Sequence, residues 1–215
     1  MTAELDHLVL AVPELGRAVR DLAGRTGVEP VAGGSHPGMG THNALLGLTW
    51  RGSRRCYLEL LAPDPAQRHV PAGATMLHLG ALGAGFEPRM LGWAVRPDDL
   101  DATVSRAREA GVDAGRPVPA SRTTAAGQHL SWRLAAPRPL GLGGVQPFLL
   151  DWGDGAHPGD ALEPALELDE LELRHPDPVT AARVLRALGV DLPVAPGPAP
   201  SLRATLTGSE GQVLL

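Results

Sequence analysis

Two polar side chains interrupt apolar stretches of this 215-residue sequence, and both have the chemistry of functional residues. His7 lies within the apolar run at residues 5–13, and Glu59 lies within the run at residues 56–61. An imidazole near neutral pH can accept a proton, donate one or bind a metal. A carboxylate among apolar residues needs a cation, a proton or a hydrogen-bond donor beside it. The residue types therefore mark His7 and Glu59 as the first candidates for a site.

A second group of candidates surrounds a glycine-rich loop at residues 33–40. His36 lies in this loop, either as a solvated loop histidine or as a mobile base above a pocket. His42 and Asn43 begin an expected strand, where they either line a cavity or serve in a turn or cap. We expect His36 and His42 to transfer protons and Asn43 to contact a ligand. Cys56, the single cysteine, lies in an apolar strand and is interpreted as a buried inert thiol.

The elements that must position these residues occur three times. In each unit a strand ends at a proline, a helical run follows, and Gly-Val-Glu or Gly-Val-Asp precedes further short strands. The proline and the glycine are separated by 14 positions in the first two units and by 13 in the third: Pro13 and Gly27, Pro97 and Gly111, Pro176 and Gly189. Three matches in order indicate repeated β-α-β-β-β units. We expect a first unit over residues 1–63, a connector over 64–89, a second unit over 90–153, and a third, smaller unit over 166–215 packed on the first two.

Composition limits the class of protein. Hydrophobic residues make up 43% of the chain, which is ordinary for a globular protein, but aromatic residues make up only 3%, so Leu, Val and Ala must fill the core. The net charge of −5, without a basic stripe, argues against nucleic acid as a partner. The sequence contains no phosphate-binding loop, dinucleotide fingerprint or Gly-x-Ser-x-Gly elbow. One cysteine and no apolar run of about 18 residues lead us to expect a cytoplasmic protein without a membrane partner.

The repeated units and several motifs together resemble the vicinal oxygen chelate superfamily, and within it the glyoxalase-like domain branch. The motifs that carry the resemblance are LDHLV at 5–9, HPGMGTHN at 36–43, YLEL at 57–60, LSWRL at 130–134, PFLLDW at 147–152 and HPG at 157–159. The resemblance covers nearly the whole chain. It implies an α+β fold in which tandem β-α-β-β-β units form curled mixed sheets around a half-open cavity, with the helices outside.

The resemblance also implies a metal site. Metal-dependent members of the superfamily hold a divalent ion with side chains from the first and last strands of the paired units. His7 matches the first-strand position here, and Glu59 matches the last-strand position of the first unit. Strand alternation agrees with this pair, because His7 shares a face with Val9 and Ala11 rather than with the larger apolar residues. Imidazole plus carboxylate is a reasonable half-site for Fe, Mn, Ni or Zn.

The second unit departs from this ligand pattern. The position equivalent to His7 is Leu91, which cannot bind a metal. The position equivalent to Glu59 is either Leu150 or Asp151, depending on a register difference of one residue. Asp151 would complete a set of three ligands with His7 and Glu59, whereas Leu150 would leave only two.

Two further residues of the second unit are candidate ligand contacts. Trp93 shares the face of Leu91 by strand alternation, so it would either form the floor of an apolar cavity or pack in the core. Arg133 lies on an alternating strand, where it would bind a substrate carboxylate or remain solvated.

Two functions remain open at this point. The first is a metal-dependent lyase, isomerase or dioxygenase that acts on a small oxygenated molecule, whose vicinal oxygens the metal would polarise. The second is a metal-free protein that binds or sequesters a small molecule, and Leu91 is the residue that favours it. Both functions require a small-molecule ligand as the partner, and a homodimer is the assembly that we consider.

Overall fold

The structure is a computed structural model that describes residues 3–124 and 127–215, whose strands form one 12-stranded mixed sheet. The strands are β1 (Glu4–Ala11), β2 (Val31–His36), β3 (Thr41–Trp50), β4 (Ser53–Pro63), β5 (Arg89–Arg96), β6 (Val118–Thr124), β7 (His129–Ala135), β8 (Phe148–Asp151), β9 (Pro164–His175), β10 (Val194–Pro196), β11 (Ser201–Gly208) and β12 (Gly211–Leu214). The helices are α1 (Leu15–Thr26), α2 (Leu100–Glu109), α3 (Pro158–Ala161) and α4 (Pro178–Ala187).

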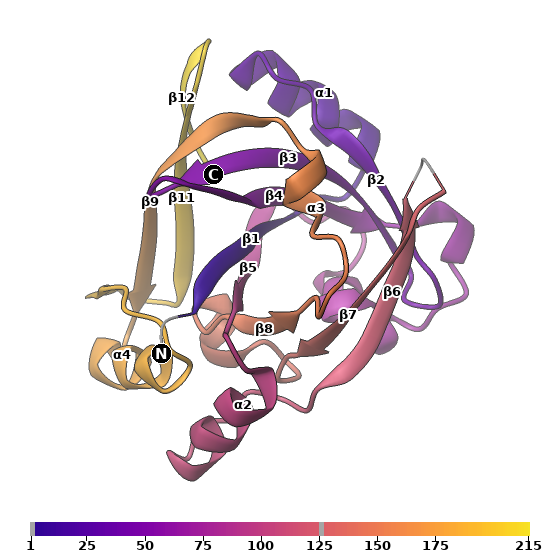
Figure 1. The fold of residues 1–215 in the computed structure, drawn as a ribbon. Helices are drawn as coiled ribbons and strands as arrows, with labels where there is room; N and C mark the ends of the chain where they lie inside the picture. Colours follow the sequence, from indigo (N-terminus) through magenta and orange to yellow (C-terminus); the bar gives the residue numbers. More distant parts are fainter. Residues whose placement is uncertain (1–2, 125–126) are drawn as a thin grey trace.

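The first eight strands close into a barrel. Around the ring the order is β1, β4, β3, β2, β6, β7, β8 and β5, and β5 pairs with β1 again. The first unit supplies β1–β4 with α1, and the second supplies β5–β8 with α2, so each contributes strand, helix and three strands. Figure 1 looks into this ring, with α1, α2 and α4 outside it. The expected α+β fold with curled mixed sheets and outer helices is therefore confirmed.

Alternation along the strands separates an inner from an outer apolar cluster. On β1, Val9 and Ala11 belong to the inner cluster, whereas Leu8 and Leu10 belong to the larger outer one. A period of two sends successive side chains to opposite faces of a strand. The inner cluster also contains Phe148 and Trp152, two of the few aromatic residues of the chain. The barrel interior is consequently a packed core with a pocket rather than an open channel.

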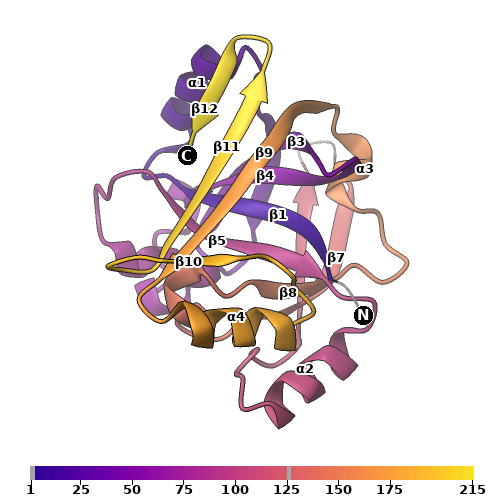
Figure 2. The same cartoon turned by 90° about the vertical axis from the view of Figure 1, so that its left-hand side faces the viewer.

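The third unit extends the sheet beyond the barrel. It comprises β9, α4, β10, β11 and β12, and it joins the barrel through parallel pairing of β9 with β3. Its apolar face lies on the outside of the barrel, where Leu168, Leu173 and Leu185 share a cluster with Leu8 and Trp93. In Figure 2, β9 and β11 cross in front of β1 and β5. The third unit therefore covers the wall that carries His7, from the side away from the pocket.

The connector between the first two units forms three short 3-10 helices: η1 (Pro65–Gln67), η2 (Ala72–Ala74) and η3 (Met76–Leu82). A fourth, η4 (Gly141–Gly144), precedes β8. Met76 and Leu79 of η3 join the inner cluster, so this segment packs into the barrel interior. Among the residues described, no helix is both long enough and apolar enough to cross a membrane.

Candidate functional site

A pocket with about 410 Å³ of empty space, counted out to its open mouth, lies inside the barrel, and several buried polar side chains line it. Every strand of the ring except β5 supplies a residue to its wall. The lining residues are His7, His36, Asn43, Tyr57, Glu59, Met76, Leu77, Arg122, Trp132, Leu134, Phe148, Leu150 and Trp152. Of the residues expected at a site, this pocket contains His7, Glu59, His36 and Asn43.

A β-bulge in β1 aims His7 at the pocket. Leu5 pairs with Val95 and His7 pairs with Ala94, so Asp6 is the extra residue on β1. Bulges of this kind redirect side chains and are common beside active sites. The Nδ1 atom of His7 lies 2.6 Å from Oδ1 of Asp6, and its Nε2 atom lies 3.5 Å from Oε2 of Glu59. The imidazole is thus held between two carboxylates, one behind it and one in the pocket.

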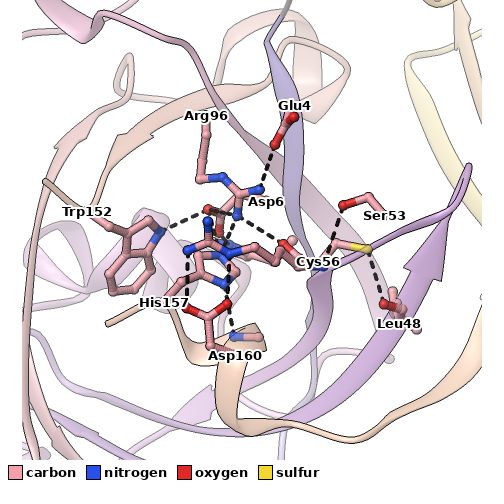
Figure 3. A network of polar contacts seen from close by, with 12 residues as sticks. Glu4, Asp6, Leu48, Ser53, Cys56, Arg96, Trp152, His157 and Asp160 are labelled. Atoms are coloured by element: carbon pink, nitrogen blue, oxygen red, sulfur yellow. Dashed lines mark hydrogen bonds and ion pairs between the residues drawn. The ribbon is translucent and has the colours of Figure 1, made fainter. Parts of the chain in front are cut away.

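Asp6 is fully buried, and four side chains contact its carboxylate. Besides His7, Oδ2 accepts hydrogen bonds from Nε1 of Trp152 at 2.9 Å, from Nε2 of His157 at 3.1 Å and from Arg96 at 3.3 Å. Figure 3 shows Trp152, Arg96 and His157 converging on this group. Burial by itself would raise the pKa of Asp6, but the bonds from His157 and His7 outweigh burial and hold that pKa well below its usual range.

The low pKa of Asp6 determines the tautomer of His7. An ionised carboxylate only accepts hydrogen bonds, so Nδ1 of His7 must carry the proton that lies between the two groups. The Nε2 atom then faces Glu59 and the pocket, where it can exchange a proton with a ligand. This is the arrangement in which a buried acid orients a histidine for acid–base work.

Asn43 and His36 hold the other side of Glu59. The amide nitrogen of Asn43 donates to Oε1 of Glu59 at 2.5 Å, and Nε2 of His36 lies 3.9 Å from the same oxygen. Turning the Asn43 amide over would place two acceptors together, so Glu59 determines its orientation. Burial lowers the pKa of His36, which therefore stays neutral, with Nδ1 bonded to Thr41 at 2.9 Å.

Gly33 supports Asn43 from behind. Gly33 is the extra residue of a bulge in β2, and a Cβ atom placed there would overlap Oδ1 of Asn43. This Oδ1 is buried and has no hydrogen-bond partner among the described residues. Only glycine leaves room for the amide to pack so closely against the strand.

Aromatic side chains form the rest of the wall. Tyr57 stacks on the ring of His7 with 4.7 Å between the ring centroids. The ring centroids of Trp132 and Trp152 lie 5.1 Å apart. Burial, followed by the charges of Asp6 and Glu59, raises the pKa of Tyr57 well above its usual value, so its hydroxyl keeps its proton. The wall therefore offers apolar surface beside a small set of hydrogen-bonding groups, as ligand pockets commonly do.

Asp151 and Arg133 lie outside the pocket, contrary to expectation. Leu150 faces the inside of β8, so Asp151 points outwards, where it lies 3.7 Å from Arg133. Arg133 in turn forms two hydrogen bonds with Asp101 of α2 on the surface. The register between β8 and its neighbours, which the sequence leaves open, selects Leu150 as the counterpart of Glu59.

His42 and Trp93 also point away from the pocket. His42 precedes the inward Asn43 on β3 and lines a different groove on the outer surface. Trp93 packs in the outer core and donates from Nε1 to the carbonyl of Val145 at 2.9 Å. A bulge at Leu91 reverses the alternation between Leu91 and Trp93, because Gly92 pairs with Val9 while Met90 pairs with Leu10. Core packing, the alternative interpretation of Trp93, is therefore the one observed.

The donor set does not fit the metal site that the resemblance implies. His7 and Glu59 face each other, but Leu150 occupies the third position and Ala94 lies opposite His7 on β5. Within residues 3–124 and 127–215, no group of three His, Cys, Asp or Glu side chains is arranged to hold a metal ion. The pair thus remains a half-site, in which His7 contacts two carboxylates.

Asp6, Arg122, Trp132 and Trp152 are among the residues of this centre that sequence reasoning missed. Asp6 is adjacent to His7, but alternation places it on the opposite face, and only the bulge brings the two together. A charged residue in an otherwise apolar strand was the available signal for Asp6. Arg122 lies in a polar stretch with no apolar pattern, so nothing local indicates that its side chain is buried.

The fold and site define a class of protein: tandem β-α-β-β-β units closed around a pocket with an imidazole–carboxylate pair. The profile of the Glyoxalase-like domain family matches residues 5–189, and the chain belongs to that family, within the vicinal oxygen chelate superfamily. No curated protein matches the chain.

Several solved structures are similar to this chain at low sequence identity. A hypothetical protein from Staphylococcus aureus is 15% identical with a TM-score of 0.67, covering 99% of this chain and 84% of its own. Methylmalonyl-CoA epimerase from Mycobacterium tuberculosis is 23% identical with a TM-score of 0.42, covering 68% and 85%. A methylmalonyl-CoA epimerase in complex with methylmalonyl-CoA is 20% identical with a TM-score of 0.48, covering 74% and 100%. The likeness to the Staphylococcus aureus protein concerns the fold.

Proposed function

We propose that this protein is an enzyme that moves protons on a small oxygenated molecule bound in the barrel, as an isomerase or lyase. The observation that carries the proposal is the chain Asp6–His7–Glu59, with contacts of 2.6 Å and 3.5 Å in a buried pocket. A base and an acid held this close can remove a proton from one position of a ligand and return it to another.

Each polar residue has a distinct part in this proposal. Asp6 keeps the Nδ1 proton of His7 in place, so that Nε2 is the atom that exchanges protons. Glu59 is the second proton-transfer group, and Asn43 fixes its Oε1 oxygen. Tyr57 keeps its hydroxyl proton, which it can donate to an oxygen of the ligand as negative charge develops there. His36 contributes a neutral imidazole beside Glu59 rather than a second positive charge.

The substrate class follows from these parts. A proton on a carbon beside a carbonyl becomes acidic enough to remove when the resulting enolate oxygen receives a hydrogen bond. The rings of Tyr57 and Phe148 lie beside His7, and hydrogen bonds are stronger in apolar surroundings of this kind. We therefore expect the reacting centre to be a carbon next to a carbonyl group.

Deuterium exchange tests the proposal across a range of candidate substrates. The protein is incubated in D₂O with a panel of small ketones, amides, hydroxy acids and 2-oxo acids, and deuterium beside the carbonyl is measured by mass spectrometry. At least one compound should exchange, and Glu59→Gln should slow this exchange about 100-fold or more. Asp151→Asn, which alters a carboxylate outside the pocket, should leave it unchanged. Equal rates for wild type and Glu59→Gln, or no exchange with any compound, would overturn the proposal.

Elemental analysis tests the metal-dependent alternative. After expression with Fe, Mn, Ni and Zn supplied, we expect much less than one metal ion per chain, because no three His, Cys, Asp or Glu side chains among the described residues are arranged to hold a metal ion. One bound ion per chain that disappears in Glu59→Gln would favour a metal-dependent lyase, isomerase or dioxygenase instead.

The aromatic wall favours a second candidate function, the metal-free binding of a small molecule without turnover. Trp132, Trp152 and Phe148 give the pocket more apolar than polar lining. Ligand-dependent thermal stabilisation that persists in Glu59→Gln, with no exchange in wild type, would identify a binding protein.

A further inference from the structure

One buried cation of the pocket has no part in the proton-transfer chain. Arg122 lies on β6, is only 4% exposed and lines the pocket. It pairs along the sheet with Leu130, a residue of the inner cluster. Among the described residues, one hydrogen bond holds it, from Nη1 to the carbonyl oxygen of Gly33. Its remaining N–H groups are available to a bound molecule.

No described carboxylate forms an ion pair with Arg122. In the described parts of the chain, no Asp or Glu oxygen lies within 4.0 Å of its guanidinium group. Arg96, the other largely buried arginine, differs because it contacts both Glu4 and Asp6. Burying a cation without a partner is costly, and an anion that enters the pocket would offset that cost.

The barrel places Arg122 opposite the proton-transfer pair. Around the ring, β6 is four strands from β1 in either direction, through β4, β3 and β2 or through β5, β8 and β7. The side chains of His7 and Arg122 therefore project from facing walls into the pocket between them. A ligand that contacts both must carry its anionic group at one end and its reacting carbon at the other.

We propose that Arg122 binds the carboxylate of the substrate, so that the protein acts on small monocarboxylic acids. This inference rests on the proposed function, because it places the reacting carbon of the substrate near His7 and Glu59. A guanidinium group presents paired N–H donors that match the two oxygens of a carboxylate. The far wall is the favourable place for this anion, because Glu59 would repel it on the near wall.

Binding of matched acids and amides tests this inference. The probes are lactate with lactamide, mandelate with mandelamide, and phenylacetate with phenylacetamide. Fluorescence of Trp132 and Trp152, which line the pocket, reports occupancy. At neutral pH at least one acid should bind wild type about tenfold or more tightly than its amide. Arg122→Gln should bind the two members of that pair equally.

Two further variants separate recognition from support of the fold. Arg133→Gln removes a surface arginine and should keep the wild-type preference for acids. Arg122→Lys keeps the charge but loses the planar fork, so a reduced preference is expected. Amides that bind wild type as tightly as acids, acids that do not bind at all, or a preference retained in Arg122→Gln would overturn the inference.

The outcomes remain distinct from those of the exchange experiment. Acid binding that depends on Arg122, without deuterium exchange, would contradict the proposed reaction and support the carboxylate site. Deuterium exchange with ketones or amides, without any preference for binding acids, would support the proposed reaction and contradict the carboxylate site.

Discussion

Asp6 and His7 are neighbours in the sequence, and their side chains form a hydrogen bond of 2.6 Å inside the barrel. Consecutive residues of a regular strand point to opposite faces, so this contact needs the bulge at Asp6. The bulge keeps Leu5 and Leu8 in the outer core while both polar side chains are buried. It brings the Asp6 and His7 side chains together beside the pocket, as the proposed proton transfer requires.

Asp6→Asn should strongly destabilise the fold, by about 3 kcal/mol or more, because it removes a buried charge that Arg96, His157 and His7 surround. Urea denaturation measures the change. Asp160→Asn is the matched control, since Asp160 also contacts an arginine, Arg55, but at the surface, where such pairs contribute about 1 kcal/mol or less. Similar losses in both variants would contradict this account of Asp6.

The same carboxylate should make the protein sensitive to acid. The folded-state pKa of Asp6 lies well below its value of about 3.9 in the unfolded chain, so its contribution is complete above that pH. The contribution is lost as pH falls further towards the folded-state pKa. Below about pH 4, wild type should therefore lose more stability per pH unit than Asp6→Asn. Parallel curves of unfolding free energy against pH would refute this.

His36 should add a second pH dependence nearer neutrality. Burial lowers its pKa in the folded state below the value of about 6.5 in the unfolded state, so the unfolded state binds protons first as pH falls. Stability should be full above about pH 6.5 and decline as pH falls towards the folded-state pKa. Melting temperatures at about pH 7.5 and pH 5 should differ less in His36→Gln than in wild type. His42→Gln, on the outer surface, should retain the wild-type difference.

Gly33→Ala should disturb the site through Asn43. The new Cβ atom would overlap Oδ1 of Asn43, so the amide must move and its hydrogen bond to Glu59 must weaken. Overpacking of this kind costs about 1–3 kcal/mol. Gly24→Ala, in exposed α1 with no neighbouring atom within 4 Å, should instead stabilise by about 0.5–1 kcal/mol. Thermal melting distinguishes the two, and equal effects would be inconsistent with the close packing at Gly33.

Cys56 should be unreactive in the folded protein. Burial raises the pKa of its thiol to about 12, so almost no thiolate exists at neutral pH. A disulfide-exchange reagent should leave the native protein unmodified and titrate one thiol after unfolding in guanidinium chloride. Rapid reaction of the native protein would show that this strand opens readily.

Local pattern was enough to predict the repeated units and the inward direction of several side chains. His7, Val9 and Ala11 share a face, as do Tyr57, Glu59 and Leu61, because alternation in a strand is a property of the chain itself. Asp6, which was missed, and Trp93, which was misplaced, lie where alternation is interrupted. Bulges at Asp6 and Leu91 change which neighbours share a face, and a bulge depends on the partner strand as well as on the local residues.

The sequence by itself therefore determined the β-α-β-β-β repeats, the glyoxalase-like family, and His7 with Glu59 as the leading pair. Only the tertiary structure decided that Asp6 stands behind His7, that Leu150 rather than Asp151 faces the pocket, and that Arg122 lies across from the pair. The physical reason is one of range. Alternation of apolar and polar residues is set by neighbours along the chain, whereas register, bulges and barrel closure are set by pairing between strands far apart in sequence.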